Sequence, residues 1–339
     1  MKAVCFDPGT NDFAIRNLPV PRLEPEDVLI RVHACGLNPV DGKIVNWKQY
    51  AAGMSSSWVP GLDVSGEIVQ TGEAVTGWKP GDRVLYHGNM FRPHGGLAEF
   101  AVHKAATLIR HPELGPAEAA SLPCAGWTAW RAMTAKLKAQ GGAGIFIAGG
   151  SSAVGAFAVQ IARLLQMGPI IASCSAANIE YVTRLGADHV LDYRTAGDSA
   201  PSLPAQIAAL TESRMVRYAL DAVGGENAAI CSDVLSFEGE MVEIVDVVNP
   251  GHYTGAFDRG LSYHQFNLGA AHRHGSMAET RLAADGRAFT EHVARGEIRL
   301  LPVTRISLEE AVPALRGILG PKQPGKTVVT LADHPGAAE

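Results

Sequence analysis

The 339-residue sequence lacks several features that mark special classes of protein. It contains no run of about eighteen uninterrupted apolar residues, which a membrane-spanning helix would need. The net charge is only −5, and Lys and Arg form no cluster dense enough to follow a phosphate backbone. We therefore expect no membrane and no nucleic acid among the partners of this protein.

Cysteines are few, and no two of them lie close together in the sequence. There is no Cys-x-x-Cys motif and the total is odd, which favours reduced thiols over a disulfide framework or a structural zinc site. The five cysteines lie far apart, at Cys5, Cys35, Cys124, Cys174 and Cys231. The first residues reach an acid and a turn, Asp7-Pro8-Gly9, before a signal-peptide core could form. The sequence thus predicts a cytoplasmic protein.

What the sequence does contain is a change of pattern near residue 120. Before it, short β-rich runs alternate with Gly and Pro, and after it strands, glycine turns and amphipathic helices alternate. Ile145 to Ala148 and Ile170 to Cys174 are expected strands, with a helix from Gly155 to Gln166 between them. This alternation predicts a parallel sheet with right-handed crossovers, in which the apolar run Gln265 to Ala270 is the last strand.

A glycine-rich turn joins the first of these strands to its helix. The turn reads Gly149-Gly150-Ser151-Ser152-Ala153-Val154-Gly155. Small side chains here let a diphosphate approach the backbone amides at a helix N-terminus. Because strand, turn and helix come in the required order and further βα units follow, the sequence predicts a dinucleotide site.

The cofactor preference is expected to show at the end of the second strand. NAD-binding proteins usually place an acid there, against the adenosine ribose. In this sequence the place holds Cys174, and no carboxylate appears before Glu180. The side chains of Ser175, Asn178 and Arg194 are suited to a 2′-phosphate, so we expect NADP(H) rather than NAD.

Ordered motifs along the whole chain resemble one known family. They are Asn38-Pro39-Val40-Asp41-Gly42-Lys43, Pro60-Gly61-Leu62-Asp63-Val64-Ser65-Gly66, Gly77-Trp78-Lys79-Pro80-Gly81-Asp82-Arg83-Val84, Leu122-Pro123-Cys124-Ala125-Gly126-Trp127-Thr128 and Gly325-Lys326-Thr327-Val328-Val329. The sequence resembles the zinc-independent branch of the medium-chain dehydrogenase/reductase superfamily, which holds quinone oxidoreductases and related enone reductases.

The resemblance implies a fold and an assembly. The expected class is α/β, with a Rossmann doubly wound parallel sheet domain and a GroES-like β-rich catalytic domain. Residues 1–123 and 273–339 would form the catalytic domain, and residues 124–272 the NADP-binding domain. The family implies an active site in the cleft between the two domains. It also implies a homodimer, which we expect to form through the sheet edge near Gln265 to Ala270.

The family's alcohol dehydrogenases hold a catalytic zinc with Cys, His and Cys on three matching segments. Here those positions hold Asn38, Leu62 and Cys124, so a single thiol remains where three ligands are needed. The sequence therefore predicts no metal. Without zinc, the easier chemistry is hydride delivery from NADPH to an already polarised acceptor, so we expect a quinone or an α,β-unsaturated carbonyl as substrate.

The resemblance assigns roles to individual residues. Asn38 and Lys43 lie on the segment beside the nicotinamide, although Lys43 could equally be a surface lysine. Asp63 either orients these residues by hydrogen bonds or has a structural hydrogen-bonding role only. A further set, Trp47, Tyr50, Met54 and Trp58, either lines an acceptor pocket or fills a small core. The expected cofactor contacts are Thr128, Gly149, Ser151, Ser152, Ala153, Val154, Gly155, Ser173, Ser175, Asn178, Tyr193, Arg194, Val223, Ile244, Val245 and Lys326. Two alternatives stay open: a zinc-free alcohol dehydrogenase-like enzyme, and a non-catalytic NADPH-binding protein.

Overall fold

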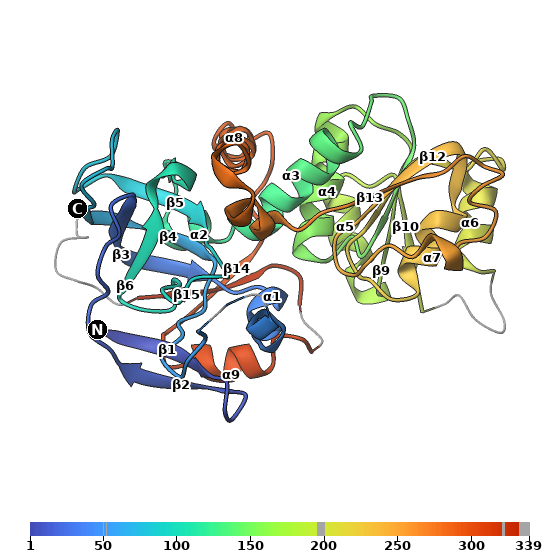
Figure 1. Cartoon of the computed structure of the whole chain (residues 1–339). Helices are drawn as coiled ribbons and strands as arrows, with labels where there is room; N and C mark the ends of the chain where they lie inside the picture. Colours follow the sequence, from blue (N-terminus) through green and yellow to red (C-terminus); the bar gives the residue numbers. More distant parts are fainter. Residues whose placement is uncertain (50, 52, 195–200, 321–322, 332–339) are drawn as a thin grey trace. The chain divides into compact units, whose positions relative to one another are not determined.

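The computed structural model describes residues 1–49, 51, 53–194, 201–320 and 323–331, and it divides the chain into two compact units (Figure 1). Unit 1 comprises Met1–Cys124, Leu268–Ala294 and Leu300–Glu339, and unit 2 comprises Ala125–Asn267 and Arg295–Arg299. Both ends of the chain thus contribute to unit 1. The fold is the GroES-like and Rossmann-type α/β combination that the sequence predicted.

Unit 1 is built on a largely antiparallel sheet. Its strand order is β14-β15-β3-β4-β5-β7, with β6 pairing to the other half of β3 and a separate β1-β2 hairpin. The strands are β1 (Lys2–Asp7), β2 (Asp12–Asn17), β3 (Asp27–Gly36), β4 (Asp63–Thr71), β5 (Arg83–His87), β6 (Phe100–Lys104), β7 (Ile109–Arg110), β14 (Val303–Ile306) and β15 (Lys326–Thr330). The helices of this unit are α1 (Pro39–Gly42), α2 (Pro116–Ala120), α8 (Gly275–Ala294) and α9 (Ala311–Arg316).

Unit 2 is a six-stranded parallel sheet in the order β10-β9-β8-β11-β12-β13. Its strands are β8 (Ile145–Ala148), β9 (Ile170–Cys174), β10 (His189–Asp192), β11 (Val216–Asp221), β12 (Leu235–Glu243) and β13 (Ser262–Gln265). Its helices are α3 (Thr128–Arg131), α4 (Ala153–Leu164), α5 (Ile179–Leu185), α6 (Leu203–Leu210) and α7 (Asn227–Asp233). The central strands β8 and β9 are buried along their whole length, because helices cover both faces of a parallel sheet.

The predicted strand over Gln265 to Ala270 is wrong. The last strand, β13, ends at Gln265, and residues Leu268–Arg273 form a 3-10 helix that belongs to unit 1. The neighbouring strand explains the difference: β12 ends at Glu243, which pairs with Gln265, and within the described residues no strand pairs with the chain that follows. The homodimer predicted through this edge stays a prediction, and β13 is the strand it would have to use.

The segment Arg295–Arg299 groups with unit 2, although the sequence-based boundary placed it in the catalytic domain. The reason is a pair of hydrogen bonds with Gln160 on α4. The Gln160 side chain donates to the Arg299 carbonyl at 3.2 Å and accepts from the Arg299 N–H at 2.8 Å. Gln160 is a buried amide, and these two bonds satisfy both of its ends.

Candidate functional site

The glycine turn lies between the carboxyl end of β8 and the first turn of α4. Gly149 has a φ of +77°, which glycine adopts without strain. A Cβ atom at Gly155 would lie 2.2 Å from the Gly149 carbonyl oxygen, so the helix packs against the turn more closely than a side chain allows. Ser152 caps α4 by accepting a hydrogen bond from the Gly155 N–H at 3.0 Å. The N–H groups of Ala153 and Val154 have no intrahelical acceptor, so this cradle fits the diphosphate of a dinucleotide.

The turn also stands at the switch point of the sheet. From β8 the chain continues to β9 and β10 on one side, and then crosses to β11, β12 and β13 on the other. In open parallel sheets, ligands bind in the crevice that this reversal leaves outside the carboxyl ends of the strands. The glycine turn therefore sits where such a ligand is expected.

The predicted adenosine contacts lie together at the ends of β9 and β10. These strands pair so that Cys174 lies opposite Asp192, which brings the loops that follow them to one edge. Asn178 donates to the hydroxyl of Ser151 at 3.3 Å and to that of Ser175 at 3.2 Å, so it ties this edge to the glycine turn. Beyond β10, the exposed Arg194 donates to the Tyr193 hydroxyl at 3.2 Å.

Two buried carboxyl groups hold the loops on the other side of the switch point. Asp221 and Glu243 are paired residues at the ends of β11 and β12, and neither is exposed. Asp221 accepts from the Val223 N–H at 2.8 Å, and Glu243 accepts from the Val245 N–H at 2.7 Å. Burial, together with the neighbouring Asp221, raises the pKa of Glu243 to about 8. These carboxyl groups thus fix the two loops that carry the predicted cofactor contacts Val223, Ile244 and Val245.

We expect a Glu243→Gln variant to be more stable than the wild type at high pH. The pKa of Glu243 is 4.5 in its ordinary state and about 8 in the fold, so between these values the folded protein binds more protons than the unfolded chain. The free energy of unfolding then falls as pH rises, by at most about 1.4 kcal/mol per pH unit. Glutamine does not titrate, so urea denaturation across this range should show a shallower fall for the variant.

A matched control for this experiment is Glu226→Gln, because Glu226 is an exposed carboxylate at the start of α7. It should keep the wild-type dependence of stability on pH. Equal slopes for Glu243→Gln and the wild type would contradict the assignment of the retained proton to Glu243.

In unit 1, three predicted site residues meet in a buried polar cluster. Asn38 precedes α1, Asp63 begins β4 and Lys326 begins β15. The Asn38 amide donates to Asp63 Oδ2 at 2.9 Å and to the Gly36 carbonyl at 3.3 Å. The Lys326 ammonium lies 3.4 Å from the same Asp63 oxygen, and it also donates to Asn38 Oδ1 and to the Leu37 carbonyl. All three side chains are buried, so the Asp63 carboxylate is paired and hydrogen-bonded away from water.

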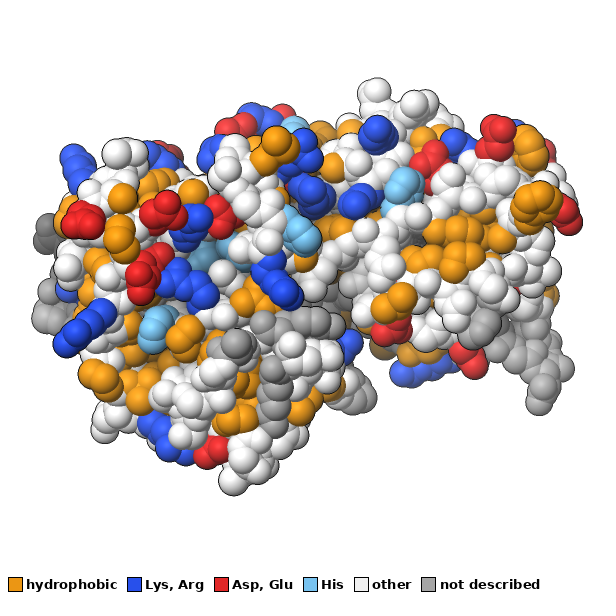
Figure 2. All heavy atoms as spheres, viewed as in Figure 1, with side chains coloured by type: hydrophobic (Ala, Val, Ile, Leu, Met, Phe, Trp, Pro, Cys, Tyr) orange, Lys and Arg blue, Asp and Glu red, His pale blue; other side chains and the backbone are white. Residues whose placement is uncertain are grey.

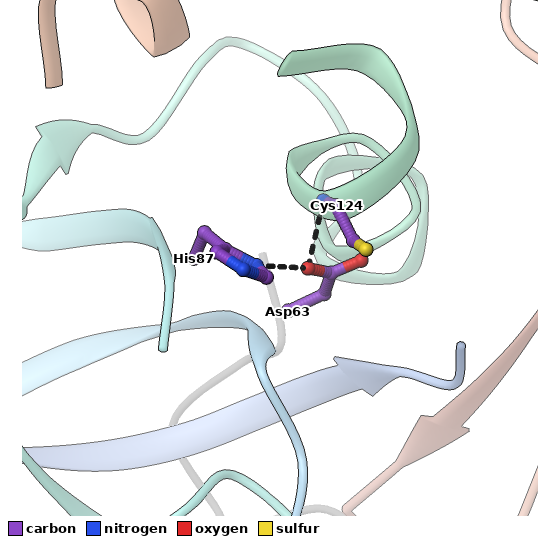
Figure 3. A group of neighbouring side chains, drawn as sticks. All are labelled: Asp63, His87 and Cys124. Carbon is purple, nitrogen blue, oxygen red and sulfur yellow. Dashed lines mark hydrogen bonds and ion pairs between the residues drawn. The ribbon is translucent and has the colours of Figure 1, made fainter. Parts of the chain in front are cut away.

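The other oxygen of Asp63 points toward His87 and Cys124, as Figure 3 shows. Asp63 Oδ1 lies 3.2 Å from His87 Nδ1 and accepts from the Cys124 N–H at 2.8 Å. The side chains of Asp63 and His87 are 0% and 3% exposed. Burial, and after it the charge of Asp63, raises the pKa of the Cys124 thiol far above its usual range. Asp63 is thus the centre of the cluster, and each of its oxygens has two partners.

Sequence reasoning missed two members of this cluster. His87 ends β5 and lies directly opposite Asp63 in the antiparallel pair β4-β5, so the signal was a cross-strand register that the sequence does not reveal. Asp41 is fully buried and accepts from the Asn38 N–H at 2.8 Å. Burial and the nearby Asp63 raise the pKa of Asp41 to about 7.

Four further predicted residues have these surroundings in the structure. Lys326, expected at the cofactor, has its ammonium enclosed by Asn38 and Asp63. Lys43 follows α1, and its side chain is half-buried. Thr128 begins α3 in unit 2 and is buried. Ser173 is buried at the end of β9, and its hydroxyl accepts from the Gly149 N–H at 3.4 Å.

The proposed acceptor pocket is largely a core. Trp47 and Trp58 are buried in the main apolar cluster of unit 1, and Met54 packs against that cluster. Tyr50 lies outside the described residues. Of the two readings that the sequence left open for this set, the described members fit the core.

The positions that hold zinc in the family do not fit a metal ion. Leu62 has no donor atom, and the Asn38 amide nitrogen donates to Asp63 and Gly36. Within the described part of the chain, a different set of donors does converge. One ligand atom each from Asp63, His87 and Cys124 lies within 4.8 Å of the other two. Of the family's three ligand positions, only Cys124 belongs to this converging set.

Comparisons with known proteins place the chain in a family. Residues 24–113 match the model of the alcohol dehydrogenase GroES-like domain, and residues 153–245 match that of the zinc-binding dehydrogenase. The chloroplast envelope quinone oxidoreductase homolog of Arabidopsis thaliana is 40% identical over 200 residues, which span 55% of this chain and 58% of that protein. The trans-enoyl reductase fsr4 of Gibberella fujikuroi is 34% identical over 65% of this chain and 67% of its own length.

A solved structure agrees with these matches along almost the whole chain. The quinone oxidoreductase from Coxiella burnetii superposes with a TM-score of 0.81 at 26% identity, covering 98% of this chain and 99% of that one. The chain belongs to the medium-chain dehydrogenase/reductase superfamily, and within it to the quinone oxidoreductase-like proteins. In the described part of the chain, no helix combines the length and the hydropathy that crossing a membrane requires.

Proposed function

We propose that this protein is an NADPH-dependent oxidoreductase that transfers hydride to a quinone or an α,β-unsaturated carbonyl compound. The observation that carries the proposal is the glycine turn at the switch point of unit 2, where a Cβ at Gly155 would overlap the Gly149 backbone. Such a turn serves a diphosphate, and the nicotinamide of the bound cofactor supplies the hydride. The names of the relatives, quinone oxidoreductase and trans-enoyl reductase, support this class of acceptor.

In this proposal, Asn38 and Asp63 position the catalytic segment instead of touching the acceptor. Both N–H groups of the Asn38 amide are occupied by Asp63 and Gly36. Lys43 follows directly on α1, and among the described residues its ammonium has no hydrogen bond or ion pair. Lys43 is therefore the side chain of the predicted catalytic set that is available to stabilise charge on the acceptor oxygen.

The preference for NADPH is proposed to rest on Arg194. Its guanidinium is exposed at the end of β10, on the same edge as Ser175 and Asn178. An Arg194→Ala variant should bind NADPH at least tenfold more weakly, because a charge-assisted hydrogen bond is worth about 1.5–3 kcal/mol. Its affinity for NADH should not change, since that cofactor has no 2′-phosphate. Titrations that follow the fluorescence of each reduced cofactor measure both constants.

Arg184→Ala is the control for this variant, because Arg184 is exposed on α5 and pairs with Glu180 on the helix surface. It should leave both dissociation constants unchanged. Wild-type protein that binds NADH more tightly than NADPH would remove the NADP assignment, and an unaltered NADPH affinity in Arg194→Ala would remove the role of Arg194.

The reaction itself is tested by steady-state oxidation of NADPH with a panel of quinones and enals. We expect turnover with at least one of these acceptors. Cofactor binding without turnover on any of them would favour the non-catalytic alternative. Reduction of NADP by simple alcohols, in place of that turnover, would favour the alcohol dehydrogenase-like one.

A further inference from the structure

Two carboxylic acids lie side by side in the interior of unit 2. Acidic side chains usually stay in contact with water, as those on the face shown in Figure 2 do. Asp221 and Glu243 are instead 0% exposed, and they stand opposite each other at the carboxyl ends of the parallel strands β11 and β12. Among the described residues, no cation neutralises either group. Two negative charges so close together and away from water would repel each other strongly.

The hydrogen bonds of this pair leave one oxygen of each carboxyl group without a partner. Asp221 Oδ1 accepts from two successive N–H groups of the loop after β11, at 2.8 and 2.9 Å. Glu243 Oε1 accepts from two of the loop after β12, at 2.7 and 2.9 Å. The remaining oxygens, Asp221 Oδ2 and Glu243 Oε2, are buried, and no N–H or O–H group of the described residues donates to them. One proton placed between these two oxygens would satisfy both.

We propose that Asp221 and Glu243 share this proton, and that the shared proton holds the loops after β11 and β12 in the conformation that binds NADPH. The two acids are then positioning residues, because they act on the cofactor through the loops. Burial, and after it the hydrogen bond with Asp221, raises the pKa of Glu243 to about 8, so the pair keeps its proton at neutral pH. The inference rests on the proposed function, since it concerns the same cofactor site.

The two loops reach the glycine turn that the cofactor is proposed to occupy. A Cβ atom at Gly149 would lie 2.6 Å from Val223 Cγ2, so the loop after β11 packs directly on the turn. The Gly225 N–H donates to Asp246 Oδ2 at 2.8 Å, which ties this loop to the one after β12. Repulsion between the two carboxyl groups would therefore displace the loops against the turn.

The other groups that face the pair keep their charge state between pH 7 and pH 9. Burial, and after it the charges of Asp221 and Glu243, raises the pKa of the Cys231 thiol on α7. Burial also raises the pKa of Tyr253 above its ordinary value of 10.0. On β13, the residue that pairs with Glu243 is the uncharged Gln265. Glu243 therefore accounts for the change of charge in this range.

The dissociation constant for NADPH should rise about tenfold between pH 7 and pH 9. At pH 9 roughly one molecule in ten still has the proton on a group whose pKa is about 8, and only those molecules keep the loops in place. Cofactor titrations at constant ionic strength measure this profile. In Glu243→Gln, a side-chain N–H replaces the shared proton at every pH. The dissociation constant of this variant should therefore stay constant over the same range.

Glu238→Gln is the matched control, because Glu238 is an exposed acid on the same strand, β12. It should show the wild-type profile. A wild type that binds NADPH equally well at pH 7 and pH 9, or a Glu243→Gln variant that keeps the wild-type profile, overturns the positioning role. A wild type that does not bind NADPH at all overturns the proposed function instead.

A second experiment tests the shared proton without the cofactor. Asp221→Asn also supplies an N–H in place of the proton, so each single variant should unfold at about the same urea concentration as the wild type at pH 7. The double variant places two NH₂ groups face to face with no acceptor between them. It should unfold at a clearly lower urea concentration than the two single effects together predict. Additive effects in this double-mutant cycle would show that the two acids do not share a proton.

Discussion

A Gly155→Ala variant is expected to lose NADPH binding, with a dissociation constant at least a hundredfold above that of the wild type. The added methyl carbon would lie 2.2 Å from the Gly149 oxygen and 3.0 Å from the Gly150 Cα, both backbone atoms that cannot rotate away. The helix N-terminus must therefore move away from the turn. Two charge-assisted hydrogen bonds to the diphosphate, each worth about 1.5–3 kcal/mol, account for a loss of this size.

Gly251→Ala is the control for that variant, measured by the same cofactor titration. Gly251 is also in unit 2, but the nearest atom to an added Cβ there lies 3.5 Å away, which is ordinary contact. It should bind NADPH as the wild type does. Tight NADPH binding by Gly155→Ala would mean that the cofactor diphosphate does not sit on this turn.

The second large effect is expected from Lys326→Met, measured by urea denaturation. The substitution leaves the Asp63 carboxylate buried without its cation, and breaking a buried pair in this way costs about 3–5 kcal/mol. Adding Asp63→Asn should recover much of the loss, because the buried charge is then removed as well. The double-mutant cycle gives the coupling energy between the two residues directly.

A surface pair provides the contrast. Lys2 and Glu309 also form an ion pair, but their side chains are 41% and 57% exposed. Lys2→Met should leave the free energy of unfolding close to that of the wild type, because water already solvates the carboxylate. If Lys326→Met proved as mild as Lys2→Met, the pair with Asp63 would not be a determinant of stability.

The parts of the fold that local pattern determines could be predicted from the sequence. The strands Ile145–Ala148 and Ile170–Cys174 were predicted with the bounds observed, because a buried parallel strand is a short apolar run ended by a turn. The glycine turn was found for the same reason. The turn needs small residues at consecutive positions, so the pattern can be recognised in the sequence. The structure explains the need at Gly155, where a Cβ would lie 2.2 Å from the Gly149 carbonyl oxygen.

What could not be predicted depends on pairing between distant segments. His87 is 24 residues from Asp63 in sequence and becomes its neighbour only through the β4-β5 register. Lys326 comes to Asp63 because β15 pairs with β3, and β3 in turn pairs with β4. The error at Gln265 to Ala270 has the same origin, since the length of β13 is set by where β12 ends. An apolar run indicates that a strand is present, but the end of the strand depends on the neighbouring strand with which it pairs.

The hydrogen bonds between Gln160 and Arg299 bear on how this chain could be divided. Residues 125–267 form a continuous stretch that looks separable as a dinucleotide-binding fragment. Cut out at those bounds, however, it would lose the backbone of Arg299. The buried Gln160 amide would then lose the donor to its oxygen and keep only the longer bond from its nitrogen to the Ala156 carbonyl. A fragment faithful to the intact protein has to carry residues 295–299 as a second piece. Unit 2 is therefore completed only after residue 299 has been synthesised, when most of unit 1 has already been made.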